Sequence, residues 1–267
     1  MEDSGKITFL NFDNSLTEQT FLQKFPHHWV DCSNIPHTNG FCEQDALDEI
    51  RNRLIKQNVQ SFVLIGNGNY HYVTYLLMER IKKPFSLVLF DHHDDMMDQG
   101  EGEGLISCGS WVAYALTNNP FLQKVCIIGV NDHNISPIPL EHFGDHVKIK
   151  WITKKILQQV PLYEIAQDVR TFLDNETNLY ISIDKDVLYK KEAFTNWDQG
   201  NMSLVQLLYL LEDFAQHYEI VGMDICGEYL LDYRNEYHSI SWEYVKMNEL
   251  VNRVIIEFIL ELELKTL

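Results

Sequence analysis

Short apolar runs alternate with amphipathic segments along most of the chain. Residues 85–90 and 178–183 are two such runs, typical of strands that are buried on both faces. The segments between the runs carry the apolar spacing of helices that cover a sheet. The pattern therefore predicts repeated β-α units, and with them an α/β fold: a three-layer α-β-α sandwich with a mostly parallel sheet.

The expected elements follow directly from this alternation. We expect strands near residues 7–12, 61–66, 85–91, 124–129, 147–151, 178–184 and 219–225. We expect helices near residues 43–57, 71–82, 108–117, 161–174, 203–217 and 243–262. No Pro/Gly/Ser-rich linker interrupts the alternation, so one domain over residues 1–267 is expected.

Polar and glycine residues gather where the expected strands end. They occupy residues 65–71, 91–95, 128–132, 184–186 and 224–228. In open parallel sheets, ligands bind in the crevice outside the carboxyl ends of the strands. The sequence therefore predicts that the functional site lies at this edge of the sheet.

Two of these strand ends carry the residue types that bind metal ions. Residues 91, 93 and 95 form an Asp-x-His-x-Asp face if the strand stays extended, and Asp184 and Asp186 follow a second strand. Several buried carboxylates would repel one another unless a cation lay between them. The spacing suits two metals bridged by carboxylates, which lower the pKa of a bound water. The alternative is a solvated acidic turn at 91–95 and a plain strand-end pair at 184–186.

Four motifs, in their order along the chain, resemble those of the ureohydrolase superfamily, the arginases and agmatinases. They are Gly68-Asn69-Tyr70-His71, Asp91-His92-His93-Asp94-Asp95, Ser182-Ile183-Asp184-Lys185-Asp186 and Gly222-Met223-Asp224-Ile225-Cys226-Gly227-Glu228. The resemblance covers roughly residues 61–230 and implies an arginase/deacetylase-like fold.

The resemblance also implies a binuclear manganese site. Its expected ligands are His71 and Asp95 on the first metal, His93 and Asp186 on the second, and Asp91 and Asp184 as bridges. Fe²⁺, Co²⁺ or Ni²⁺ would fit the same ligand types. Water activated by the two metals would attack the carbon of a guanidino group, and urea would be released.

The expected catalytic set consists of Glu228, Asp95 and Cys108. Glu228 would hold the positive charge of the substrate. It lies four residues after Asp224, whereas the family's glutamate lies three residues after its aspartate. A bulge at Gly227 is expected to direct the Glu228 side chain toward the site. Cys108 stands where arginases have a histidine credited with proton transfer, so His92, His133, His238 or water would have to move the proton. A buried structural thiol is the alternative role for Cys108.

The loop at residues 96–104 bears on the substrate. It is acidic and glycine-rich, so it would repel an α-carboxylate but accept a peptide or a decarboxylated amine. The alternative is a mobile loop distant from the substrate. This acidic loop and the short length make the chain resemble an atypical branch of the superfamily. That branch includes peptide arginases, which convert peptidyl arginine to ornithine. The other hypotheses are an agmatinase-like enzyme acting on a small guanidine, a deacetylase-like hydrolase and a non-catalytic metal-binding module.

Composition narrows the class of partner. The net charge of −18 argues against sequence-independent nucleic-acid binding and would attract a cationic substrate. The five cysteines form no C-x-x-C pair, which indicates reduced thiols in a cytoplasmic protein. Neither a signal peptide nor a membrane span is expected. A homo-oligomer is possible, with the helix near residues 243–262 at its interface.

Overall fold

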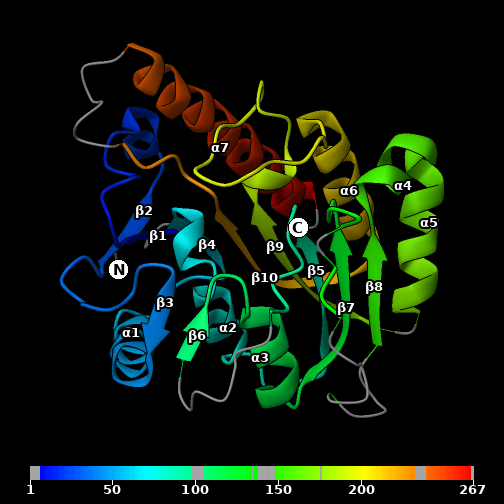
Figure 1. The fold of residues 1–267 in the computed structure, drawn as a ribbon, viewed down its shortest axis with the longest axis horizontal. Coiled ribbons are helices and arrows are strands. Elements are labelled where there is room, and N and C mark those ends of the chain that lie inside the picture. Colours follow the sequence, from blue (N-terminus) through cyan, green and yellow to red (C-terminus); the bar gives the residue numbers. More distant parts are fainter. Residues whose placement is uncertain are drawn as a thin grey trace.

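The computed structural model describes residues 7–97, 105–133, 135–137, 143, 148–174, 176–231 and 239–265. Within these residues an eight-stranded sheet, in the order β2-β1-β4-β10-β9-β5-β7-β8, forms the centre of the molecule (Figure 1). Every pairing in it is parallel. Its strands are β1 (Ile7–Asn11), β2 (His27–Asp31), β4 (Phe62–Gly66), β5 (Phe85–Phe90), β7 (Leu122–Ile128), β8 (Lys148–Ile152), β9 (Asn178–Asp184) and β10 (Glu219–Cys226).

Helices cover both faces of this sheet. One face packs against α1 (Gln44–Lys56), α2 (Val73–Met78) and α3 (Trp111–Asn118). The other packs against α4 (Lys154–Gln159), α5 (Leu162–Leu173), α6 (Leu204–His217) and α7 (Ser239–Lys265). Short 3-10 turns are η1 (Thr20–Lys24), η2 (Gly68–Tyr70) and η4 (Lys185–Val187), and β3 (Phe41–Glu43) pairs antiparallel with β6 (Leu105–Ser107).

The apolar runs explain this layering. In β5, Leu87 and Leu89 lie in the core beneath α1 to α3, whereas Val88 lies in the core beneath α5 to α7. Successive side chains of a strand point to opposite faces, so a strand with helices on both sides must be apolar throughout. Truncating any of these leucines to alanine should cost about 2–5 kcal/mol of unfolding free energy.

The structure confirms the expected α-β-α architecture and adds elements that were not expected. The edge strand β2 was missed because only Val30 of its five residues is buried, so it forms no apolar run. β3, β6 and α4 are too short to give a periodic signal. No helix in the described part of the chain has the length and apolarity needed to cross a membrane.

Candidate metal centre

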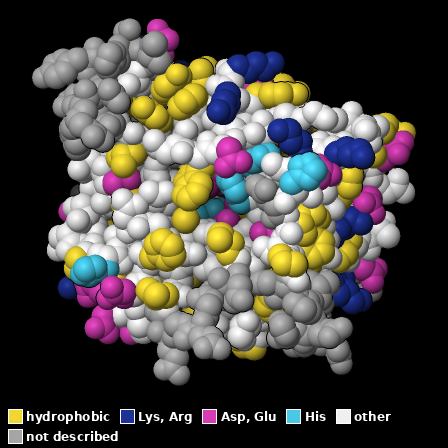
Figure 2. Space-filling model, viewed as in Figure 1, with side chains coloured by type: hydrophobic (Ala, Val, Ile, Leu, Met, Phe, Trp, Pro, Cys, Tyr) yellow, Lys and Arg dark blue, Asp and Glu magenta, His cyan; other side chains and the backbone are white. Residues whose placement is uncertain are grey.

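A cavity of about 560 Å³ opens at the carboxyl edge of the sheet. All six expected metal ligands line it, together with Asp94, Cys108 and the apolar side chains of Phe41, Met97, Leu105 and Trp197. Figure 2 shows histidine and acidic side chains gathered near the middle of this face, with apolar side chains around them. The expectation that the strand ends converge on one site therefore agrees with the geometry.

His71 follows β4 in the turn η2 and is buried. Its Nδ1 lies 3.1 Å from Asp95 Oδ2, 3.3 Å from Asp91 Oδ2 and 3.6 Å from Asp184 Oδ2. On the other side of the ring, Nε2 lies 2.9 Å from the Ser182 hydroxyl, which itself donates to Asp224 Oδ1. Because the Ser182 proton is used, its oxygen must accept from Nε2–H, so Nδ1, which faces the carboxylates, is the nitrogen that a cation would bind.

His93 is held in a similar way. Its Nδ1 lies 2.9 Å from Asp186 Oδ2 and 3.5 Å from Asp91 Oδ1. Its Nε2 donates to Asp198 Oδ1 at 3.1 Å, so the nitrogen that faces Asp186 is the one free to bind a cation. Asp198 lies on an exposed loop far along the chain and was not among the expected site residues.

Asp95 reaches the site by a route that was not expected. The strand ends at Phe90, so residues 91–95 do not continue as an extended face, and Asp95 has a φ of 49° in the left-handed region. Trp111 Nε1 donates to Asp95 Oδ2 at 2.6 Å, and the indole also packs against the ring of His71. The Trp111 contact therefore fixes the carboxylate in a backbone conformation that is costly for a residue with a side chain.

The described residues contain three groups whose ligand atoms lie within 4.8 Å of one another. They are His71/Asp91/Asp95, Asp91/His93/Asp186 and His71/Asp184/Cys226. Asp91 belongs to the first two groups, as a bridging carboxylate would. Asp184 lies close to His71 and contacts Cys226, which the expected ligand set did not include.

The electrostatics of these groups indicate a cation site. Burial and the neighbouring Asp91 carboxylate raise the pKa of Asp95 to about 7. Burial and like charges also raise the pKa of Asp184 and Asp186. Carboxylates crowded this closely hold protons unless a positive charge replaces them. Two imidazole nitrogens facing four buried carboxylates form a donor set that fits divalent transition metals.

Comparison with known proteins places the chain in a family. The arginase family model matches residues 11–229. A Thermotoga maritima protein described only as uncharacterized is 30% identical over 222 residues, which cover 83% of this chain and 79% of that protein. The chain belongs to the arginase family. It is therefore an arginase-family ureohydrolase, and the expected superfamily is confirmed.

Solved structures show the same fold at low sequence identity. Proclavaminate amidino hydrolase from Streptomyces clavuligerus aligns with a TM-score of 0.64 and 16% identity, covering 93% of this chain and 91% of that one. The Trypanosoma cruzi formiminoglutamase structure with Mn²⁺ aligns with a TM-score of 0.64 and 13% identity, covering 94% and 95%. An arginase-like fold with a binuclear manganese centre thus has a precedent among the relatives of this chain.

Glu228 departs from the role expected for it in this arginase-family chain. It does not line the cavity: its carboxylate is buried, ion-paired with Lys185 Nζ, and accepts from Asn252 Nδ2 at 2.6 Å. The sheet register does shift between Ile225 and Cys226, but Gly227, with a φ of 90°, then turns Glu228 away from the site. The expected irregularity in the strand is present, but Lys185 holds the Glu228 carboxylate outside the cavity lining.

Cys108 lies in the cavity wall, at the position where the resemblance to arginases implies a proton-transfer histidine. Burial raises its pKa to about 12, so it is a neutral thiol at ordinary pH and unsuited to act as a nucleophile. Among the alternative proton carriers, His92 is buried behind the cavity wall, His133 is exposed outside it, and His238 lies outside the described residues.

Proposed function

We propose that the chain hydrolyses the guanidino group of an arginine side chain within a peptide, releasing urea and leaving ornithine. The observation that carries this proposal is the composition of the cavity wall. Its described lining contains no lysine or arginine, so the α-carboxylate of free arginine would lose hydration without gaining a positively charged partner. A peptide carries an amide at that position and avoids this cost.

The rim of the cavity favours a large substrate over a small one. Phe41, Met97, Leu105 and Trp197 line the cavity and yet are 67%, 63%, 41% and 42% exposed. Apolar side chains gathered around a polar site are typical of a surface that another molecule covers. The peptide on either side of the arginine would cover them, whereas agmatine would leave most of this surface in water.

The residues of the site perform three tasks. His71, Asp91, His93, Asp95, Asp184 and Asp186 would hold two divalent ions, for which Mn²⁺ has the family precedent. Such a pair of ions supplies a Lewis acid that activates water at neutral pH. Ser182 and Asp198 orient the two imidazoles, and Trp111 positions Asp95.

Asp94 is the candidate for receiving the substrate's positive charge in place of Glu228. Among the described lining residues, it is the carboxylate outside the expected ligand set. The backbone N–H of Met96 and the hydroxyl of Ser136 donate to it at 3.2 and 3.1 Å, so its position is fixed before the substrate enters. We place this activity in the cytoplasm, which agrees with five cysteines that are all free.

An agmatinase-like activity is the second candidate, because agmatine also lacks a carboxylate and fits a wall without cations. A deacetylase-like site with one metal is less consistent with the structure, since both Asp95 and Asp186 reach the cluster. The same ligand cluster favours chemistry over a non-catalytic metal-binding module.

Mass spectrometry separates these activities. Metal-loaded protein would be incubated with an arginine peptide, free arginine and agmatine, and with Asp91→Asn protein as control. Loss of one CN₂H₂ unit from the peptide, with little change in the small molecules, supports the proposal. Turnover of agmatine alone overturns the peptide assignment, and equal turnover by Asp91→Asn overturns the role of the metal site.

A further inference from the structure

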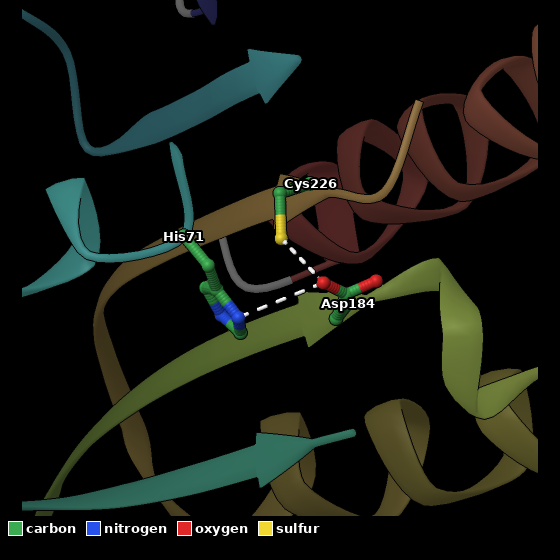
Figure 3. Close-up of side chains that lie close together, drawn as sticks. All are labelled: His71, Asp184 and Cys226. Atoms are coloured by element: carbon green, nitrogen blue, oxygen red, sulfur yellow. Dashed lines mark hydrogen bonds and ion pairs between the residues drawn. The ribbon is translucent and has the colours of Figure 1, made fainter. Parts of the chain in front are cut away.

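Cys226 places a thiol within the candidate metal centre. It ends β10 and is fully buried, with Sγ 3.1 Å from Asp184 Oδ2. His71, Asp184 and Cys226 together offer three ligand atoms that lie within 4.8 Å of one another. Figure 3 shows these side chains coming from three separate segments and pointing toward one another.

The backbone holds the sulfur in this position. A Cβ at Gly227 would lie 2.5 Å from Asp184 Oδ1 and 2.8 Å from the backbone nitrogen of Lys185. The chain after Cys226 is therefore packed tightly against the end of β9, which keeps the backbone of Cys226 beside Asp184. Cys126 provides the contrast, because it is also fully buried but lies in the apolar core of the sheet.

We propose that Cys226 is a ligand of the metal ion held by His71, and that this subsite prefers a thiophilic ion such as Zn²⁺, Co²⁺ or Fe²⁺ to Mn²⁺. The inference rests on the proposed function, since it refines one half of the two-metal site. A thiolate is a soft ligand that Mn²⁺ binds weakly compared with these ions, and the sulfur binds with release of its proton to solvent.

Cobalt spectroscopy tests the sulfur directly. The metal-free full chain would be titrated with Co²⁺ while the thiolate-to-cobalt charge-transfer absorption in the near ultraviolet is recorded. The band should form in the unmodified protein and in Cys108→Ser, which removes the other thiol near the site, and should be lost in Cys226→Ser. A band that is missing from the unmodified protein, or that persists in Cys226→Ser, overturns the proposal.

X-ray absorption of the zinc-loaded, unmodified protein gives a second test that needs no variant. A sulfur neighbour at about 2.3 Å from zinc supports the assignment, and a shell of nitrogen and oxygen alone overturns it. The Co²⁺ affinity should fall at least about tenfold in Cys226→Ser, since loss of even an outer partner of a ligand costs about that much affinity. The Mn²⁺ affinity should fall less, because Mn²⁺ binds sulfur weakly. An unchanged preference counts against the proposal.

The two proposals fail in different ways. Two Co²⁺ per chain and urea release without the thiolate band would overturn the role of Cys226 and leave the proposed function standing. The thiolate band without urea release from any guanidino compound would support Cys226 as a ligand and overturn the hydrolytic function.

Discussion

Replacing Lys185 by methionine tests whether Glu228 is structural or faces the substrate. Lys185 is completely buried, and its ammonium pairs with Glu228, which is itself only 2% exposed. Methionine keeps most of the length of the side chain and removes the charge. The Glu228 carboxylate would then remain buried with Asn252 and Gln19 as its remaining donors.

The size of the effect follows from this arrangement. Removing one partner of a buried ion pair costs about 3–5 kcal/mol, because an uncompensated charge stays in the interior. Since two amide donors remain, we expect Lys185→Met to lower the unfolding free energy by about 3 kcal/mol, the low end of that range. Urea unfolding of metal-free protein measures this without the added stability that bound metal supplies.

Adding Glu228→Gln to Lys185→Met completes the test. The neutral pair should recover most of the lost stability, with a coupling energy of about 2 kcal/mol or more in the double-mutant cycle. A loss below about 1 kcal/mol for Lys185→Met would refute the reasoning. So would a Glu228→Gln single variant that keeps its stability but loses turnover, because Glu228 would then reach the substrate.

Three further predictions address the rim, the support of the ligands and the effect of pH. Phe41→Ser should raise the KM for an arginine peptide by about 5–30-fold, corresponding to about 1–2 kcal/mol. Ile55→Ser, which changes an exposed apolar residue outside the cavity, is the control in steady-state assays. Trp111→Phe removes the hydrogen bond to Asp95 and should weaken metal binding about 10–100-fold in competition titrations. Trp151→Phe should not, because the buried indole nitrogen of Trp151 has no hydrogen-bond partner among the described residues. The unfolding free energy of the metal-free protein should fall as pH rises from about 4 to 7. Folding raises the pKa of Asp95 from 3.8 to about 7, so the folded chain binds a proton that the unfolded chain has lost. An equally steep fall of unfolding free energy with pH in Asp95→Asn would contradict this.

The main strands and the candidate ligands were predictable for one physical reason. A parallel sheet buried on both faces needs long apolar runs, and its strands end at one edge, so polar residues after those runs meet in space. Asp91 and Asp184 each follow such a run directly, and His71 follows the β4 run after one short turn. The route of Asp95 was not predictable, because it depends on a left-handed residue stabilised by Trp111, whose hydrogen bond is visible only in three dimensions.

The end of β10 shows why the rest required the structure. Strand periodicity puts Asp224, Cys226 and Glu228 on one face, so the sequence itself places Cys226 on the same side of the strand as Asp224. Asp224 and Cys226 do lie on the side of the ligands, where they contact Ser182 and Asp184.

The periodicity fails one residue later. Gly227 adopts a φ of 90°, and a single residue out of the strand conformation is enough to send the next side chain to the other side. The Glu228 carboxylate is buried because it pairs with the buried ammonium of Lys185. Lys185 lies between two expected metal ligands in the sequence. The same local event thus leaves a thiol beside the metal centre and removes a carboxylate from the cavity. Under the proposed function, Asp94 would then receive the substrate's positive charge, and the proposed sulfur ligand Cys226 would shift the metal preference.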